Sequence, residues 1–281
     1  MLRTRQGLRL LGPSDLPAML RLAGLDPVVN VFADYRSRLT QLDPRWLGGE
    51  VWGYEVDGEL VSACHFAANL VPVQATPDAL VAFSQQALGQ PRRCSTIVGP
   101  ADQVELLWRQ LEQEWSPARD IRWNQPHMEI STTPAVRPDP LVRRSEKADV
   151  PTLYPACVAM YTEEVGVSPE INGGSELYRA RVAQLVAKGW SFARIEDGRV
   201  VFKAEVAAAS PHACQVQGVY VAPDRRGQGL AAQGMAAVVA IALREIAPVV
   251  SLYVNDHNVA ARRAYQRTGF TVTGTFSTIM F

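Results

Sequence analysis

The sequence lacks the features that would place a protein in a membrane, in an oxidising compartment or on nucleic acid. It has no run of about 18 consecutive apolar residues, so nothing predicts a transmembrane helix. Its four cysteines form no CxxC pair and no metal-ligand spacing, which favours buried free thiols over disulfides or zinc. Lysine plus arginine equals aspartate plus glutamate at 28 each, so no net charge favours nucleic acid or an anionic membrane.

The N-terminus also lacks a secretion signal. Residues 1–12, MLRTRQGLRLLG, contain no apolar segment followed by small residues at a cleavage site. We therefore expect a soluble, cytoplasmic protein without a metal centre, while the oligomeric state stays open. A length of 281 residues exceeds one average domain and favours two domains of ordinary size.

One stretch of the chain predicts an anion-binding loop. Residues 216–231 read VQGVYVAPDRRGQGLA, which is typical of an apolar strand, a turn and the start of an alanine-rich helix. Gly227 and Gly229 leave room for successive backbone N–H groups to converge. The helix N-terminus adds unpaired N–H groups and the positive end of its dipole, and Arg226 adds a fixed charge. The loop therefore predicts a phosphate or pyrophosphate site, although its spacing is neither GxxxxGK[ST] nor GxGxxG.

This loop resembles the pyrophosphate-binding loop of the GNAT superfamily of acyl-CoA N-acyltransferases. The family consensus after a strand is Arg or Gln, two residues, Gly, one residue, and Gly or Ala, which here reads Arg226-x-x-Gly229-x-Ala231. A second stretch, residues 251–270, resembles the family's next strand and helix, SLYVNDHNVAARRAYQRTGF, with matches at Asn258, Ala261, Tyr265 and Gly269-Phe270. The two matches occur in order and at the usual separation, so the resemblance is specific over residues 141–281.

The order of predicted elements repeats along the chain. Asp15-Leu16-Pro17 parallels Asp149-Val150-Pro151 at the start of a helix, and Asp57-Gly58 parallels Asp197-Gly198 as a type I′ hairpin signal. Where the anion loop would recur, near residues 72–90, the arginine and the paired glycines are missing. We therefore predict an α/β (α+β) fold of two tandem GNAT-like mixed β-sheets flanked by helices, although such repeats also arise by convergence.

A proline-rich stretch at residues 131–140 predicts the boundary between the two halves. Residues 1–130 are predicted to be a degenerate GNAT-like domain without a coenzyme loop, which buries residues such as Trp108 or Trp123. Residues 141–281 are predicted to be the acetyl-CoA-binding catalytic domain. Apolar periodicity and turn signals predict helices over 26–42, 77–88, 101–114, 149–164, 175–188 and 230–246, and strands over 8–11, 51–56, 59–66, 94–98 and 121–130.

The resemblance implies roles for residues of the second half. The loop backbone would hold the donor pyrophosphate, and the pantetheine arm would run along the preceding strand, with the N–H at or near Val221 meeting the thioester carbonyl. Asn258 matches a position that contacts the coenzyme arm. Tyr265 matches the general acid for the departing thiolate, although a buried tyrosine also serves simply as packing. The residues implied in donor binding are Val219, Tyr220, Val221, Arg226, Gly227, Gln228, Gly229, Leu230, Ala231 and Asn258.

The general base is less clearly indicated. Several family members carry a glutamate on the loop's strand, but Gln215 and Gln217 occupy that strand here and accept no proton at neutral pH. Glu205 on the preceding strand is our candidate, and Glu163, Glu164 or a chain of waters are the alternatives. Glu163 and Glu164 also lie where the family binds the acceptor, so they are predicted to bind its ammonium group, or else they form a solvated helix end. We assign no catalytic role to His212 or His257.

These residues predict an acetyl-CoA-dependent N-acetyltransferase that transfers an acetyl group to a primary amine by direct attack on the thioester. The alternative is a non-catalytic acyl-CoA-binding or regulatory protein, which the missing strand carboxylate favours, and a different nucleotide-binding enzyme is a third hypothesis. We expect a small-molecule or peptide amine as the acceptor, with no nucleic acid or membrane partner. Its identity stays open among small amines, amino acids, antibiotics and protein amines, because acceptor loops carry no short motif.

Overall fold

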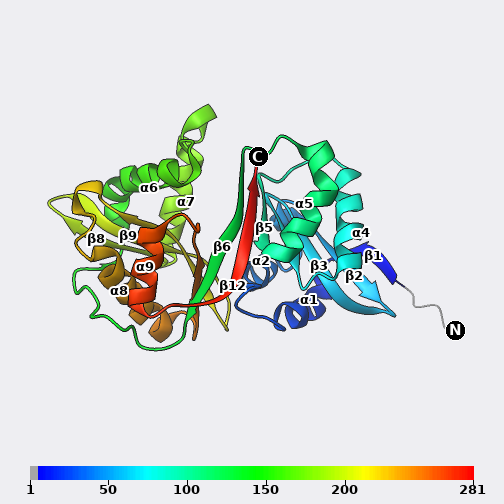
Figure 1. Cartoon of the computed structure of the whole chain (residues 1–281), viewed down its shortest axis with the longest axis horizontal. Helices are drawn as coiled ribbons and strands as arrows, with labels where there is room; N and C mark the ends of the chain where they lie inside the picture. Colours follow the sequence, from blue (N-terminus) through cyan, green and yellow to red (C-terminus); the bar gives the residue numbers. More distant parts are fainter. Residues whose placement is uncertain (1–5) are drawn as a thin grey trace. The chain divides into compact units, whose positions relative to one another are not determined.

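The computed structural model describes residues 6–281, which divide into two units. The first unit runs to His127 and also includes Tyr253–Asp256 and Thr273–Phe281, and the second comprises Met128–Leu252 and His257–Val272. Residues 1–5, part of the N-terminus examined for a secretion signal, lie outside the described residues. Each unit is a mixed β-sheet flanked by helices, so the predicted α/β class is confirmed (Figure 1).

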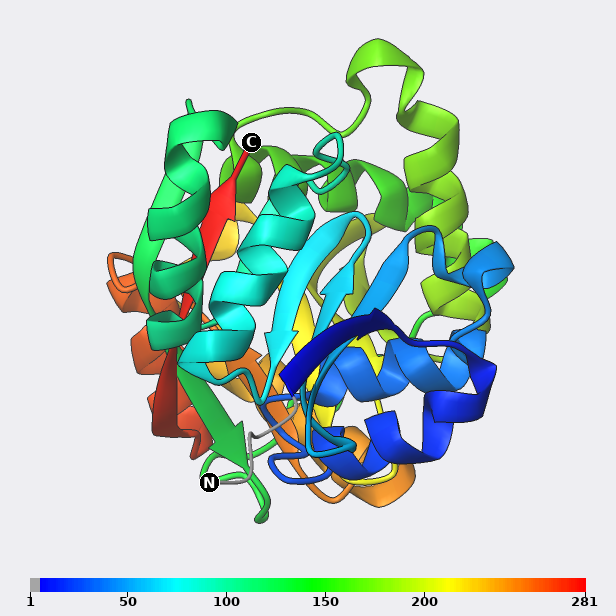
Figure 2. The same ribbon diagram turned by 90° about the vertical axis from the view of Figure 1, so that its right-hand side faces the viewer.

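The first unit has the strand order β1-β2-β3-β4-β5-β12-β6, in which β4 and β5 run parallel. Figure 2 shows α4 and α5 side by side over one face of this sheet. Trp52, Phe66 and Phe83 form the centre of the core between these two helices and the sheet. The elements are β1 (Gln6–Leu10), α1 (Leu16–Ala23), α2 (Val31–Thr40), α3 (Pro44–Leu47), β2 (Glu50–Val56), β3 (Glu59–Phe66), β4 (Asn69–Val73), α4 (Pro77–Leu88), β5 (Thr96–Pro100), α5 (Ala101–Trp115), β6 (Asp120–Ile130) and β12 (Thr271–Met280).

The second unit has the strand order β11-β10-β9-β8-β7, in which β10 and β11 run parallel. Helices α6 and α7 pack on one face, where Leu153 and Val182 join Val200 in a core cluster, and α8 packs on the other face against β9 and β10. The elements are β7 (Arg143–Arg144), α6 (Val150–Val165), α7 (Ser175–Ala187), β8 (Ser191–Glu196), β9 (Arg199–Ala209), β10 (Cys214–Val221), α8 (Leu230–Glu245), β11 (Val250–Tyr253) and α9 (Val259–Thr268).

The two units do not correspond to a single cut at residues 131–140. The last strand, β12, joins the first unit because Phe276–Met280 pairs antiparallel with Thr96–Pro100 of β5. The end of β11 joins it too, since the N–H of Val254 donates to the carbonyl of Pro126 at 3.2 Å. The proline-rich stretch itself lies against the second unit, where the N–H of Asp139 donates to the carbonyl of Gln233 at 3.0 Å. The halves of the sequence therefore exchange segments between the units.

The two halves share local structure at the positions where the sequence repeats. Arg9 and Asp15 form an ion pair at 2.8 Å, and Arg143 and Asp149, each 134 residues further on, form the same pair at 2.7 Å. Each aspartate also accepts the backbone N–H three residues before it, which fixes the turn that leads into α1 or α6. The repeated motif is thus an aspartate that closes the 3-10 turn leading into the helix, at Pro13–Asp15 and at Lys147–Asp149.

The hairpins repeat in the same way. Asp57-Gly58 and Asp197-Gly198 all have positive φ, as the predicted type I′ turns require. A register shift follows Tyr54 in the first hairpin and Arg194 in the second, which are equivalent positions 140 residues apart. The two halves share aspartate turns, type I′ hairpin turns and register shifts, and these common features support the interpretation of the chain as a repeat.

Several details differ from the predictions. Helix α2 begins at Val31 rather than at residue 26, and strand β4 was not predicted at all. Of the two tryptophans offered as buried, Trp108 is buried, whereas Trp123 is 39% exposed. All four cysteines are buried free thiols, as predicted. Within residues 6–281, no helix combines the length and apolar character needed to cross a membrane.

Gly234 sets the distance between α8 and the sheet. A Cβ at this position would lie 2.6 Å from the ring of Phe202, which is fully buried in β9. We expect Gly234→Ala to lower the free energy of unfolding by about 1–3 kcal/mol, because overpacking outweighs the usual gain from alanine in a helix. Urea denaturation measures this change. The control is Gly274→Ala, where a Cβ meets no atom within 4 Å; equal stability of the two variants contradicts the prediction.

Candidate donor-binding site

Strand β10 separates from its parallel neighbour after a short pairing. Among the described residues, the pairing with β11 covers Cys214–Gln215 opposite Val250–Ser251. On its other side β10 stays paired with β9 up to Val221, but with an extra residue between Gln217 and Tyr220. Gly218 lies in this bulge with φ of +62°, a conformation that favours glycine.

The bulge leaves backbone groups of β10 on the side away from β9. The N–H of Ala222 donates to the carbonyl of Val201 in β9 at 3.0 Å, and because strand N–H groups alternate in direction, those of Val221 and Val219 point to the opposite side. The carbonyl of Val221 points to the same side as its N–H group, away from β9, and accepts a hydrogen bond from Nε of Arg226 at 3.1 Å. The strand thus presents a polar edge that can pair with an extended ligand.

The predicted anion loop follows directly. A 3-10 turn at Pro223–Arg225 ends the strand, and Gly227 and Gly229 adopt φ of +75° and +82°. Gly229 is the N-cap of α8, and no side chain caps this end of the helix. A Cβ at either glycine would meet no atom within 4 Å, so the loop is open around its backbone. Uncapped N–H groups at the start of a 16-residue helix suit an anion.

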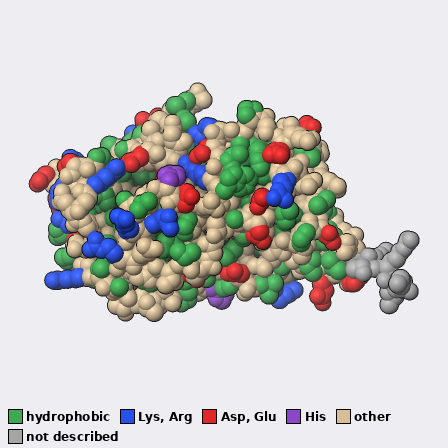
Figure 3. All heavy atoms as spheres, viewed as in Figure 1, with side chains coloured by type: hydrophobic (Ala, Val, Ile, Leu, Met, Phe, Trp, Pro, Cys, Tyr) green, Lys and Arg blue, Asp and Glu red, His purple; other side chains and the backbone are tan. Residues whose placement is uncertain are grey.

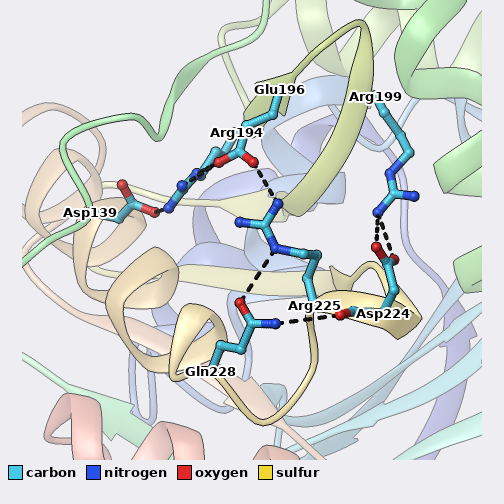
Figure 4. Close-up of polar contacts among 7 residues, drawn as sticks. All are labelled: Asp139, Arg194, Glu196, Arg199, Asp224, Arg225 and Gln228. Atoms are coloured by element: carbon cyan, nitrogen blue, oxygen red, sulfur yellow. Dashed lines mark hydrogen bonds and ion pairs between the residues drawn. The ribbon is translucent and has the colours of Figure 1, made fainter.

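A chain of charged side chains supports this loop from the hairpin of β8 and β9 (Figure 4). Arg225 of the loop donates to Glu196 at 2.6 Å, and Glu196 also pairs with Arg194. Arg194 in turn donates to Asp139 at 2.8 Å, at the end of the proline-rich stretch. The hydrogen bonds from Arg225 and Arg194 lower the pKa of Glu196, so this carboxylate stays charged at neutral pH.

Hydrogen bonds of Asp224 and Gln228 also stabilise the loop. Asp224 accepts two hydrogen bonds from Arg199, at 2.6 and 2.7 Å, and Gln228 contacts both Arg225 and the carbonyl of Asp224. Sequence reasoning missed this network, because its members are far apart in the chain. Gln228 thereby contributes a side-chain contact within the loop in addition to its backbone.

The equivalent loop of the first unit is closed to an anion. The side chain of Thr76 caps α4 by accepting the N–H of Ala79 at 3.3 Å. The N–H of Ala75 donates to Gln103 at 3.3 Å, and that of Thr76 donates to Ser62 at 3.1 Å. Side chains of the protein therefore satisfy the amides at the start of α4, whereas no side chain caps the start of α8.

Arg226 and Glu163, predicted for the donor and the acceptor, lie together. Nη2 of Arg226 donates to Oε2 of Glu163 at 2.7 Å, and the pKa of Arg226 is raised by this bond. Both side chains are about half exposed, so the pair is a surface ion pair of small net strength. The end of α6 and the donor loop thus meet at this point.

Glu205, the predicted base, lies beneath the bulge in a buried ion pair. Its Oε1 is 2.7 Å from Nζ of Lys203, and the same ammonium donates to the carbonyl of Gly218 at 2.8 Å. Burial alone lowers the pKa of Lys203, but the charge and hydrogen bond of Glu205 outweigh it and raise the pKa overall. Glu205 is therefore the counter-charge of a buried ammonium, which needs such a partner.

Lys203 was not among the predicted site residues, although the sequence carries a signal for it. It is one of three lysines in the chain and interrupts the apolar run VVFKAEV with a glutamate two positions later. Residues two apart share one face of a strand, so the spacing predicts a buried pair.

Tyr265 lies buried on α9 beside Phe270. Burial, and after it the charge of Glu164, raises the pKa of its phenol, so the hydroxyl keeps its proton at neutral pH. Asn258 is the N-cap of α9, and its side-chain oxygen accepts the N–H of Ala261 at 3.1 Å. Its predicted coenzyme contact would therefore fall to the amide nitrogen. The histidines His212 and His257 are exposed, as predicted.

Basic side chains gather on the second unit (Figure 3). The donor loop and α9 contribute exposed Arg226, Arg263 and Arg267. The whole chain carries no net charge, so this grouping is local. A local positive potential favours an anionic ligand near the loop.

Family comparison assigns the segment that contains these features. Residues 175–270 match the model of the acetyltransferase (GNAT) family, and residues 49–153 match a domain of unknown function, DUF4081. The first match includes β10, the glycine loop and α9. The second half of this chain therefore carries a GNAT-family segment, and this family supports acyl transfer in general. No curated protein matches the chain significantly.

Solved structures share the fold over nearly the whole chain. An acetyltransferase of the GNAT family from Colwellia psychrerythraea aligns with a TM-score of 0.60 at 15% identity, covering 98% of this chain and 99% of that one. A GCN5-related N-acetyltransferase from Sphaerobacter thermophilus aligns with a TM-score of 0.62 at 17% identity, covering 99% of this chain and 96% of that one. A tandem GNAT protein from the clavulanic acid biosynthesis pathway aligns with a TM-score of 0.55 at 14% identity, covering 98% of each chain. The predicted tandem GNAT-like fold is confirmed.

The thiol nearest the site should be chemically inert. Burial raises the pKa of Cys157 to about 12, so its thiolate fraction at pH 8 is on the order of 10⁻⁴. We expect a thiol reagent to label none of the four buried cysteines of the native protein within minutes, and all four after unfolding in guanidinium. Leu177→Cys, at a site that is 80% exposed, is the positive control. Rapid labelling of Cys157, identified by mass spectrometry, contradicts the prediction.

Proposed function

We propose that the second unit binds acetyl-CoA and transfers its acetyl group to a primary amine. The observation that carries this proposal is the combination of an uncapped helix N-terminus at Gly229 with a released strand edge at Val219–Val221. The first feature suits a pyrophosphate and the second suits an extended amide-containing arm. The family match over residues 175–270 supports acyl transfer as the reaction class.

The chain's own groups divide the work of donor binding. The N–H groups of the loop, from Arg226 to Ala231, bind the pyrophosphate, and the ion-paired Arg225 holds the loop in place. The backbone of Val219 and Val221 pairs with the pantetheine arm, and the N–H of Val221 donates to the thioester carbonyl. When bound, acetyl-CoA supplies an activated acyl group with a thiol as the leaving group. A donor aimed at that carbonyl stabilises the negative charge that develops on it.

Tyr265 is proposed as the general acid. Its raised pKa keeps the phenol protonated at neutral pH, which is the state that a proton donor needs. Glu163 and Glu164 at the end of α6 are proposed to attract the acceptor's ammonium group. Glu205 is the ion-pair partner of Lys203, so we place no general base at Glu205. We assign removal of the acceptor's proton to a chain of waters, which is one of the alternatives that the sequence leaves open.

A second candidate function is acyl-CoA binding without catalysis. It is favoured by one observation, namely that Glu205 and Glu163 each form an ion pair with a cation of the protein itself. Both carboxylates are therefore already engaged by partners within the protein. Release of free thiol from acetyl-CoA in the presence of amines separates the two candidates, since a binding protein releases none.

The donor assignment predicts one acetyl-CoA site per chain. We expect Gly229→Trp and Arg226→Ala to weaken binding, the first by filling the open loop and the second by removing charge; a loss of about tenfold or more in affinity corresponds to at least about 1.4 kcal/mol. Titration calorimetry gives both the number of sites and the affinity. Gly58→Trp is a matched control, since Gly58 has a similar φ of +87° and the same open surroundings in the first unit. Two sites, or unchanged affinity in both loop variants, contradict the assignment.

The acid assignment predicts a selective loss in Tyr265→Phe. Removal of the hydroxyl should lower kcat by about 10²- to 10⁴-fold, because a general acid acts in the transition state, while donor affinity changes far less. The ring is kept, so its packing on Phe270 is retained. Steady-state kinetics and calorimetry on the same variant separate the outcomes. Turnover at the parent rate would leave Tyr265 a packing residue, and lost donor binding would make its hydroxyl a coenzyme contact.

A further inference from the structure

The ion pair beneath β10 is joined to the glycine of the bulge between Gln217 and Tyr220. Nζ of Lys203 lies 2.8 Å from the carbonyl oxygen of Gly218, and it is also the ion-pair partner of Glu205. Lys203 is 1% exposed and Glu205 is 6% exposed, so both charges are buried. A Cβ on Gly218 would come within 3.2 Å of the ammonium, of Oε2 of Glu205 and of Cε of Met160. The backbone of the bulge is therefore in direct contact with the ion pair of Lys203 and Glu205.

The first unit offers an internal comparison. By the hairpin repeat of 140 residues, Ala63 stands where Lys203 stands and His65 where Glu205 stands. Ala63 and His65 of β3 pair with Val73 and Val71 of β4, which leaves one residue between the two partners. The corresponding partners in β10, Tyr220 and Gln217, are separated by two residues. The unit with the charged pair has the bulge, and the unit without it keeps a regular strand.

The parallel neighbour of that strand is paired over a short stretch in both units. The described pairing of β4 with β5 covers Asn69–Leu70, and that of β10 with β11 covers Cys214–Gln215. The first unit nevertheless keeps these strands close, because a Cβ on Gly99 of β5 would lie 3.3 Å from the ring of Pro72 in β4. The difference between the units is therefore the bulge itself, which is described for β10 and not for β4.

Burying two charges is costly unless they are well paired, and apolar residues would often serve stability equally well. A buried pair that also binds a backbone carbonyl can instead specify one local conformation. We propose that Lys203 and Glu205 are positioning residues: their ion pair holds the Gly218 carbonyl and so fixes the bulge that frees the backbone of Val219 and Val221 for the acyl-CoA donor. This inference rests on the proposed function, and it assigns Glu205 to the geometry of the donor site instead of to proton transfer.

Three variants test the proposal. Lys203→Met removes the ammonium and Glu205→Gln removes the counter-charge at nearly constant volume, while Lys203→Met/Glu205→Leu replaces the pair with apolar side chains. Val200→Ala is the control, because Val200 is a buried core residue of the same strand that pairs with Ile195 of β8 and is not among the residues nearest Gly218. Thermal unfolding, titration with acetyl-CoA and hydrogen exchange of the 214–222 segment are measured for each full-length variant.

We expect both single variants to bind acetyl-CoA about tenfold or more weakly and to exchange faster at residues 214–222. The apolar double variant should recover thermal stability, because no buried charge is left unpaired, but it should not recover donor affinity. That split distinguishes positioning from a purely stabilising role. Val200→Ala should lose stability and keep the parent's affinity. If a single variant fails to fold, the affinity of the double variant for acetyl-CoA decides the question.

Three outcomes overturn the inference. Parental affinity in the folded variants would show that the pair does not position the donor site. Recovery of affinity together with stability in the double variant would make the pair's role structural only. Unchanged affinity in Glu205→Gln, with loss of the acidic limb of the pH profile of kcat/KM, would make Glu205 the general base. Failure of the parent protein to bind acetyl-CoA would instead refute the proposed function, so the two failures are distinguishable.

Discussion

The hydrogen bond from the buried ammonium of Lys203 to the carbonyl of Gly218 is the interaction on which the candidate site depends. Strand N–H groups are normally satisfied within the sheet, but the described pairing of β10 with β11 ends at Gln215. After the bulge, Val219 and Val221 have backbone groups that face away from β9, directly before the glycine loop. The bulge at Gly218 therefore places a strand edge next to a helix N-terminus, and the two together form one candidate ligand site.

The same fold occurs twice, but only the second copy leaves its polar backbone groups available. In the first unit, the side chains of Ser62, Thr76 and Gln103 take up the amides at the start of α4. In the second, glycines at 227 and 229 provide neither a cap nor a steric obstacle. Beside the bulge of β10, the difference is one of hydrogen-bond satisfaction at a helix end, since the hairpins and the aspartate-stabilised turns of the two copies agree.

The sequence allowed the fold class, the hairpins and the glycine loop to be predicted because each depends on local chemistry. Asp-Gly turns, a strand followed by a glycine turn, and helix-start aspartates are read within a few residues. The supports of the site could not be read in this way. The charged network joins residues that are distant in the sequence and come together only in the folded sheet, namely Asp139, Arg194, Glu196 and Arg225. Lys203 of β9 likewise contacts Gly218 of the neighbouring strand β10. The division into units escaped prediction for the same reason, because the pairing of β12 with β5 joins the two ends of the chain.

The chain passes between the two units on both sides of α9. Helix α9, which carries Asn258 and Tyr265, is connected at both ends to segments of the first unit: Tyr253–Asp256 precedes it and Thr273–Phe281 follows it. The first of these segments is held by hydrogen bonds to β6 and the second by pairing with β5. A cut at residues 131–140 would therefore separate β5 and β6 from both anchors of α9. The first unit therefore takes β12, the neighbour of β5, from beyond the proline-rich stretch, and no single cut there would leave both units intact.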